Sequence, residues 1–145
     1  MFDLKGAFEL RPAVPSDADA IVRISTGPIA DKRAFIVESL ARRDVVTAHA
    51  SERMVGYIIW DRAFFGRPFA WLVGVDPAFR RRGVGVLLMR GFETGCRGES
   101  LFTSTNESNR PMQALLARLG FLPSGRVENL DPGDPELFYF KAAVT

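Results

Sequence analysis

The chain has 145 residues, of which only one is a cysteine and only one a histidine. Cys96 alone excludes an intrachain disulfide and a cysteine metal cluster, and the lone His49 excludes a histidine-rich zinc site. We therefore expect no bound metal. We expect Cys96 to be a small buried residue rather than a catalytic thiol. His49 follows a strand-like alternation, and we expect it to have a structural role.

The sequence also lacks long apolar runs and a strong excess of charge. No run nears the roughly 20 apolar residues that span a bilayer, and residues 1–5 lack the basic and apolar regions of a secretion signal. We expect a cytoplasmic protein that does not bind membranes. The formal net charge is only +2, which gives no argument for nucleic acid as a partner.

The composition that remains is globular, with 47% hydrophobic and 25% charged residues. The length allows one ordinary domain, so we expect a single domain over residues 1–145. Periodicity and turn residues predict strands at 8–13, 45–50, 54–60, 69–75, 101–105, 121–127 and 136–141. Helices are expected from Ser16 or Asp17 to the break at Gly27-Pro28, at 31–43, from the arginines to Gly95 or Gly98, and at 111–119. Residues 61–68 and 106–109 are expected to be loops.

The stretch from Phe69 to Met89 combines a buried strand, a basic turn and a helix start. Asp76-Pro77 ends the strand, because proline has no amide to donate. The run Arg80-Arg81-Arg82-Gly83-Val84-Gly85 follows, and apolar residues then recur at helical spacing. Amides at a helix start lack internal partners, glycines let an anion approach the backbone, and arginines add charge. The turn therefore suits a diphosphate.

Two familiar phosphate-binding motifs are excluded at this turn. A Walker loop needs Lys-Ser/Thr after its last glycine, where this chain has Val86-Leu87. A dinucleotide fingerprint needs a third glycine, where this chain has Leu88. The spacing alone fits a second interpretation equally well, because charge runs usually lie on the surface: a solvated arginine cluster ahead of an ordinary helix.

The pattern Arg80-x-x-Gly83-x-Gly85 after the strand end at 73–77 resembles the acetyl-CoA signature of the GNAT (GCN5-related N-acetyltransferase) superfamily. The order of elements and the Leu-Gly-Phe at 119–121 extend the resemblance over most of the chain. The resemblance implies an α/β (mixed α+β) architecture, the GNAT fold, in which helices cover both faces of a central, mixed and splayed sheet. It also implies acetyl-CoA as the cosubstrate.

The resemblance assigns particular residues to that cosubstrate. Val73, Gly74 and Val75 match positions that pair with the pantetheine arm, and the Val73 amide matches the donor to the thioester oxyanion. Asn109 matches a residue that contacts the same arm, although it also suits a helix N-cap. Gly74 equally suits a tight helix–sheet contact. The matched diphosphate positions are Arg80, Arg81, Arg82, Gly83, Val84, Gly85 and Val86.

The chain departs from the family at the groups that move protons. Leu116 stands where many members have a tyrosine acid, and Phe69 stands where some have a glutamate base. Ser104 occupies the place of a glutamate in ribosomal-protein acetyltransferases. The acidic or hydroxyl residues that remain as candidates are Ser104, Asp61, Asp134 and Glu136, and of these we take Glu136 and Ser104 as the candidate catalytic residues. Glu136 opens the last strand, where its alternative role is a solvated carboxylate.

Aromatic residues gather at positions 64–71. Core packing is the first interpretation of Phe64, Phe65, Phe69 and Trp71. If some of them line a pocket, they favour an acceptor with an apolar or aromatic portion. Trp71 and Asp61 are accordingly our candidate substrate contacts.

The leading functional hypothesis is an N-acetyltransferase that moves acetyl from acetyl-CoA to a primary amine of a small molecule, peptide or protein by direct attack in a ternary complex. The alternative is a non-catalytic acyl-CoA-binding or regulatory module, which keeps the basic turn and lacks proton-handling groups. A nucleic-acid-binding function is less consistent with the sequence, because the arginine run has no interleaved aromatic residues and no recognisable recognition helix. Dimers are frequent among similar proteins, so a homodimer is a further expectation.

Overall fold

The computed structural model describes residues 7–25 and 29–143, without the side chains of residues 29–31. Its strands are β1 (Glu9–Pro12), β2 (Asp44–Ala50), β3 (Arg53–Phe64), β4 (Arg67–Val75), β5 (Leu101–Asn106), β6 (Leu122–Val127) and β7 (Glu136–Lys141). Its helices are α2 (Ala18–Ile24), α3 (Ile29–Arg42), α4 (Val84–Gly95) and α5 (Arg110–Arg118), with 3-10 turns η1 (Pro15–Asp17) and η2 (Pro77–Phe79). Within the described ranges, no helix is long and apolar enough to cross a membrane.

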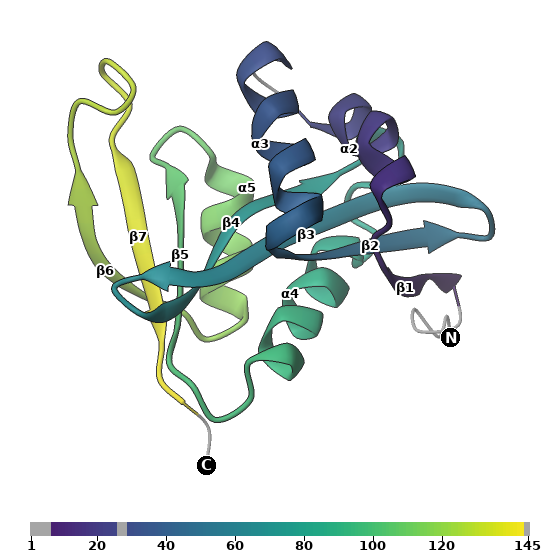
Figure 1. Cartoon of the computed structure of the whole chain (residues 1–145). Helices are drawn as coiled ribbons and strands as arrows, with labels where there is room; N and C mark the ends of the chain where they lie inside the picture. The colour runs from purple at the N-terminus through teal and green to yellow at the C-terminus, as the bar shows by residue number, and fades with distance from the viewer. Residues whose placement is uncertain (1–6, 26–28, 144–145) are drawn as a thin grey trace. The chain divides into compact units, whose positions relative to one another are not determined.

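The described strands form one seven-stranded sheet in the order β1-β2-β3-β4-β5-β7-β6 (Figure 1). The β4–β5 pair is parallel, whereas β1–β2, β2–β3, β5–β7 and β6–β7 are antiparallel. This mixed sheet confirms the expected fold class. The chain divides into two compact units, Met1–Trp60 with Leu72–Thr94, and Asp61–Trp71 with Gly95–Thr145. Strands β3 and β4 each contribute residues to both units.

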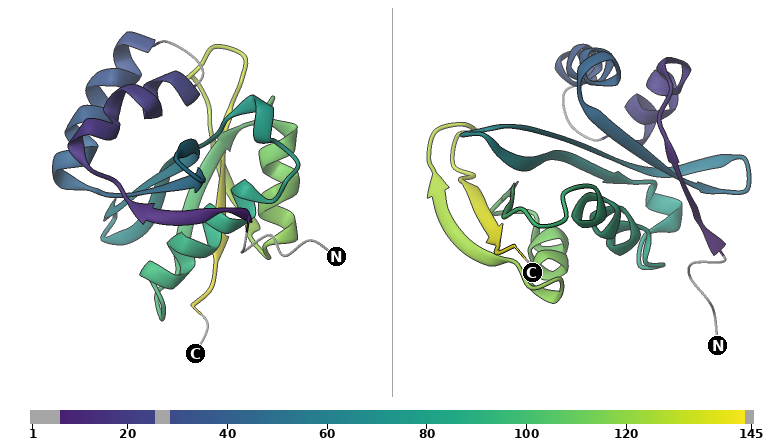
Figure 2. Two further views of the ribbon diagram at one scale, coloured as in Figure 1. Left: turned by 90° about the vertical axis from the view of Figure 1, so that its right-hand side faces the viewer. Right: turned by 60° about the horizontal axis from the view of Figure 1, so that its bottom comes forward.

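In the first unit, α2 and α3 lie side by side on one face of the strands and α4 lies on the other (Figure 2). Gly56 on β3 permits the approach of α4, because a Cβ there would lie 2.9 Å from Val84 Cγ1 and 3.0 Å from Leu88 Cδ1. The sequence patterns did not single out this glycine. The core under α2 and α3 consists of buried apolar side chains: Ile21, Val22, Ile24, Ile36, Val45, Met54, Tyr57 and Ile59.

In the second unit, β7 lies between β5 and β6, and α5 lies along one face of these strands (Figures 1 and 2). Side chains alternate across β5, so Leu101, Thr103 and Thr105 are buried while the residues between them are half-buried. Leu116 of α5 and Leu119, which follows the helix as its C-cap, are buried as well. The strands therefore present one covered face and one partly open face.

One expected loop is wrong. Residues 61–68 are mostly strand, because β3 continues to Phe64 and β4 begins at Arg67. The turn consists of Phe65 and Gly66, whose φ angles are 53° and 76°, the left-handed pair that suits a two-residue hairpin. Gly66 and Pro68 made this segment look like a loop, whereas Phe64 extends the hairpin by packing its ring 4.5 Å from that of Phe69.

The start of the first helix also differs from the expectation. Neither Ser16 nor Asp17 caps α2 through its side chain; instead the Asp17 carboxylate accepts a hydrogen bond from the Val14 amide at 2.9 Å and closes η1. The expected break at Gly27-Pro28 lies outside the described residues. Asn106, expected in a loop, is the last residue of β5. The remaining elements lie within one or two residues of the predicted bounds.

Candidate functional site

The basic turn is fixed at its start by Asp76, which follows β4 directly. Its Oδ1 accepts from the Ala78 amide at 2.9 Å, and its Oδ2 accepts from Arg53 Nη2 at 2.9 Å. The Ala78 amide, and after it Arg53, hold the pKa of the Asp76 carboxyl below its ordinary value. The Asp76 amide also donates to the Val55 carbonyl of β3. These bonds connect η2 to the end of the strand and so determine where the arginines begin.

The turn itself leaves a set of backbone donors open. Arg81 and Gly83 have φ angles of 63° and 86°, and the first α4 bond runs from the Leu87 amide to the Gly83 carbonyl at 3.0 Å. None of the amides of residues 81–86 has a hydrogen-bond acceptor among the described residues. A helix start of this kind attracts anions, because its amides are unpaired and the helix dipole is positive there.

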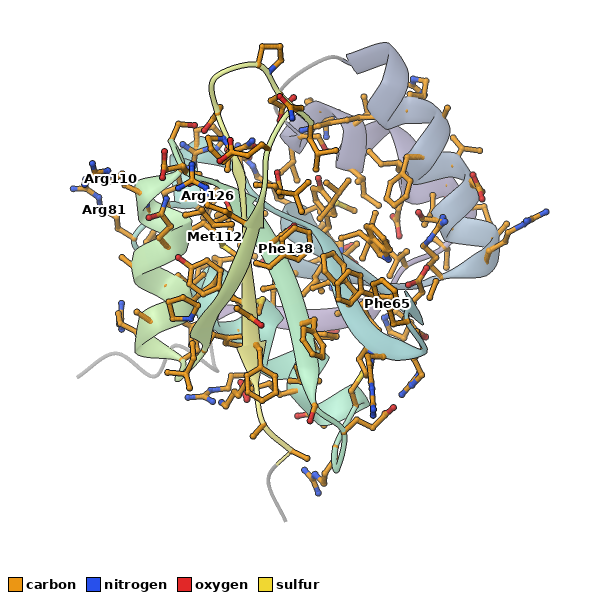
Figure 3. All side chains as sticks on the ribbon, turned by 90° about the vertical axis from the view of Figure 1, so that its left-hand side faces the viewer. Phe65, Arg81, Arg110, Met112, Arg126 and Phe138 are labelled. Atoms are coloured by element: carbon orange, nitrogen blue, oxygen red, sulfur yellow. The ribbon has the colours of Figure 1, made fainter. Side chains whose placement is uncertain are left out.

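The three arginines differ in their surroundings although all are exposed. The guanidinium of Arg82 lies 5.1 Å from the ring centre of Phe79 and 5.5 Å from that of Phe8. Arg53 lies over the same Phe79 ring at 4.9 Å. Arg81 extends away from the ribbon (Figure 3). Phe79, which the sequence analysis missed, therefore brings two cations together beside the open amides.

Gly74 shows the close contact that one interpretation expected, but with a side chain of the neighbouring strand rather than with a helix. A Cβ at Gly74 would lie 2.3 Å from Tyr57 Cε1. The Tyr57 hydroxyl is hydrogen-bonded to Ser25 Oγ at 2.6 Å, and burial raises the pKa of the phenol. Val73 and Val75 are half-buried. The glycine thus lets a large buried ring lie against β4.

Asn109 is the N-cap of α5, as its alternative role predicted: its Oδ1 accepts from the Met112 amide at 3.3 Å. Leu116 is completely buried, so no proton donor stands at that position. The helix ends as predicted, with Gly120 at φ 88° and the Phe121 amide donating to the Leu116 carbonyl.

The two candidate catalytic residues of the second unit are in direct contact. Ser104 Oγ donates to Glu136 Oε2 at 2.7 Å. Both side chains are half-buried and come from neighbouring strands, β5 and β7, on the face that α5 does not cover. Ser104 lies opposite Phe138 in the ladder, and Glu136 lies two residues before Phe138 on the same face.

The two candidate substrate contacts also bond to one another, since Trp71 Nε1 donates to Asp61 Oδ1 at 2.7 Å. Trp71 is 39% exposed, and its ring centre lies 4.5 Å from that of the buried Phe69. Phe69 in turn contacts Phe138 at 5.9 Å. The aromatics therefore pack against one another, as core side chains do, and also leave Trp71 partly open.

The loop between β6 and β7 is held by its own acids. Asp134 accepts from the Ser108 amide at 3.0 Å and from Ser108 Oγ at 2.6 Å, and Asp131 accepts from Asn106 Nδ2 at 2.8 Å. These carboxylates position the loop against the end of β5.

The only cysteine and the only histidine, Cys96 and His49, are both buried. Cys96 is buried, 3.7 Å from Arg62 Nη2. His49 is 7% exposed and hydrogen-bonded through Nε2 to Thr47 Oγ1 at 2.9 Å, and burial, followed by the Arg11 charge, lowers its pKa. Among the residues that the structure describes, no group of three or more potential ligands is arranged to hold a metal ion.

The comparisons with known proteins address the family directly. The sequence profile of the acetyltransferase (GNAT) family matches residues 19–121. The chain belongs to this family. A GNAT-family acetyltransferase from Bacillus cereus is 32% identical, with a TM-score of 0.83 over 95% of this chain and 99% of that one. The comparison with curated proteins gave no match.

Two more distant structures share the GNAT fold. YncA from Salmonella typhimurium, solved with its cofactor acetyl-CoA, is 18% identical, with a TM-score of 0.71 over 94% of both chains. The ribosomal-protein-S18-alanine N-acetyltransferase from Escherichia coli is 17% identical, with a TM-score of 0.76 over 95% of this chain and 96% of that one. At these identities the likeness shows the fold alone.

Proposed function

We propose that this GNAT protein is an N-acetyltransferase that transfers acetyl from acetyl-CoA to a primary amine. The observation that carries the proposal is the row of unpaired amides at residues 81–86, at the start of a 12-residue helix where an anion can bind. Arg80, Arg81 and Arg82 add the positive charge that a pyrophosphate requires. The YncA structure with acetyl-CoA supports this assignment, because it shares the fold.

The cosubstrate arm would pair with β4 at Val73, Gly74 and Val75, and with Asn109 at the α5 cap. The amine nitrogen attacks the thioester carbonyl carbon, the C–N bond forms, and the negative charge that develops on the oxygen is held by the Val73 amide. The C–S bond then breaks and CoA leaves as a thiolate, which takes a proton from water. Leu116 offers no proton at this step.

Glu136 would take the proton that the attacking nitrogen loses, directly or through one water. Ser104 donates to one carboxylate oxygen of Glu136, which orients the other. In a Glu136→Gln variant we expect turnover at neutral pH to fall by about 100-fold or more, with acetyl-CoA affinity unchanged. An unchanged rate would remove Glu136 from the mechanism.

The test of the cosubstrate site uses Gly85, which lies in the first turn of α4. Gly85→Leu puts a side chain among the open amides without opposing the helix, so we expect CoA affinity to fall by at least about 100-fold while thermal stability is retained. Gly85→Ala is the matched control, which adds only a methyl group and should still bind CoA. Calorimetric titration with CoA measures both, and equal affinity in the two variants would show that the pyrophosphate lies elsewhere.

A non-catalytic acyl-CoA-binding module remains the second candidate, because the tyrosine and glutamate positions are occupied by Leu116 and Phe69. The two functions differ in one measurement. The enzyme releases free CoA from acetyl-CoA when an amine is present, whereas the binding module binds acetyl-CoA and releases none with any amine.

A further inference from the structure

The second unit carries a connected aromatic face on the side of its strands that α5 does not cover. Phe64 is its centre, with ring centres 4.5 Å from Phe69, 5.5 Å from Phe102 and 5.7 Å from Phe138. Trp71 continues the row beyond Phe69. We call these five residues the aromatic face: Phe64, Phe69, Trp71, Phe102 and Phe138.

The register of the strands places these rings together. Phe69 lies opposite Phe102 in the parallel ladder, and Phe102 and Phe138 belong to the half-buried set of β5 and β7. Phe64, Phe102 and Phe138 are each only half-buried, and Trp71 is 39% exposed. Figure 3 shows Phe138 along the strands and Phe65, which is 90% exposed, at the hairpin end. The face therefore offers aromatic surface to a ligand.

The carboxylate of Glu136 adjoins this face and has one oxygen available to a ligand. Glu136 Oε2 accepts from Ser104, and Glu136 Oε1 has no partner among the described residues. Asp134 accepts from Ser108 at both oxygens, and Asp61 accepts from the Trp71 ring nitrogen and the Ala63 amide at Oδ1. One carboxylate beside a set of rings complements one cationic or neutral amine attached to an aromatic body.

We propose that the acceptor is an arylalkylamine, a small molecule with one primary amine joined to an aromatic ring by a short carbon chain. This inference rests on the proposed acetyl transfer. Glu136 and Phe138 are two residues apart on one face, about 6.6 Å along the strand, so an amine at Glu136 places a ring tethered by about two or three carbons over Phe138.

The experiment compares amines that differ in one property at a time. 2-Phenylethylamine and n-propylamine both have one primary amine, but only the first has an aromatic ring. Spermidine has additional amines, and a short peptide with an amino-terminal glycine presents its amine on a peptide backbone. Free CoA release gives kcat/KM for each. We expect 2-phenylethylamine to exceed n-propylamine by about tenfold or more, from burial of the ring. A higher value for n-propylamine, spermidine or the peptide would overturn the proposal.

Phe138→Leu tests the face itself, with Phe140→Leu as the matched control. Phe140 lies on the same strand and face, but its ring contacts Phe102 rather than Phe64 or Phe69. We expect Phe138→Leu to raise KM for 2-phenylethylamine about three- to tenfold, with KM for acetyl-CoA unchanged, and Phe140→Leu to change neither. Equal effects of both substitutions would contradict a specific ring contact.

A binding measurement separates this inference from the proposed reaction. Trp60→Phe leaves Trp71 as the chain's only tryptophan, so its fluorescence reports ligands on the aromatic face. We expect 2-phenylethylamine to change that fluorescence saturably and n-propylamine not to do so at the same concentration. If no amine releases CoA but the titration saturates, acetyl transfer fails and the ligand class stands. If CoA is released but the fluorescence does not respond, the ligand class is wrong.

Discussion

At the scale of single residues, Gly74 on β4 lies in close contact with the ring of Tyr57 on β3. A Cβ at position 74 would lie 2.3, 2.9 and 3.1 Å from three atoms of the Tyr57 ring. Because this ring is buried and hydrogen-bonded to Ser25, it has little room to move. We expect Gly74→Ala to lower the free energy of unfolding by about 1–3 kcal/mol, measured by urea denaturation.

A second substitution separates crowding from any other effect of the alanine. In a Tyr57→Leu background the added methyl group meets a smaller side chain. The double variant should then lose less free energy of unfolding than the sum of the losses in the two single variants, which a double-mutant cycle measures. Additive costs would mean that the ring does not account for the glycine.

His49 carries a prediction about pH. Burial, followed by the charge of Arg11, lowers its pKa below the ordinary 6.5, while Asp17, Glu9 and Glu52 act in the opposite direction. The unfolded chain therefore binds the proton first as the pH falls, so stability present above pH 6.5 is lost as the pH drops through the folded pKa. We expect urea denaturation to show a larger loss between pH 7 and about pH 5 in the wild type than in His49→Gln. Equal losses would assign the pH dependence to other groups.

At the scale of elements, η2 depends on an ionised Asp76. The Ala78 amide and Arg53 lower the pKa of Asp76 from its ordinary 3.8. A depressed carboxyl stabilises the fold above the unfolded pKa and loses that contribution as the pH falls through the folded value. When the pH is lowered below about 4, the free energy of unfolding should therefore fall more steeply in the wild type than in Asp76→Asn. Asp44→Asn, on an exposed residue at the start of β2, is the control and should follow the wild type.

The elements also show what the sequence could predict. The strand, basic turn and helix from 69 to 95 were predictable, because proline, glycine and apolar spacing are local signals. The β3–β4 hairpin was not, because its strands continue through Asp61 and Arg62 on account of a cross-strand ring pair, Phe64 with Phe69. Such a pair exists only after the strands have met.

The candidate site divides in the same way. The open amides of 81–86 follow from where a helix begins, which the residues Gly83 and Val84 indicate locally. The hydrogen bond between Ser104 and Glu136 joins residues 32 positions apart and depends on the register of β5 with β7. Both residues were named from the sequence, but their contact required the fold, as did the role of Phe79 in holding Arg53 and Arg82.

At the scale of the whole molecule, the two compact units raise the question of whether they unfold together. β3 and β4 each contribute residues to both units. If one unit unfolds, it therefore disrupts strands that belong in part to the other unit. We therefore predict one cooperative transition, in keeping with a single domain. Each unit holds one tryptophan, Trp60 in the first and Trp71 in the second.

Urea denaturation of two variants measures this directly. Trp71→Phe leaves a reporter in the first unit and Trp60→Phe leaves one in the second. For each variant we compare the urea midpoint measured by tryptophan fluorescence with the midpoint measured by circular dichroism. The two midpoints should coincide in each variant. A fluorescence transition that precedes the loss of secondary structure in either variant would show that the units unfold separately.

The burial of Cys96 has a practical consequence for enzymology. The only sulfhydryl of the polypeptide is 1% exposed, so a colorimetric disulfide reagent will react slowly with the native enzyme and rapidly with liberated coenzyme. The background colour then reports denatured protein. Because both thiols release the same chromophore, a parallel cuvette without acetyl-CoA separates the signal of denatured protein from that of the product.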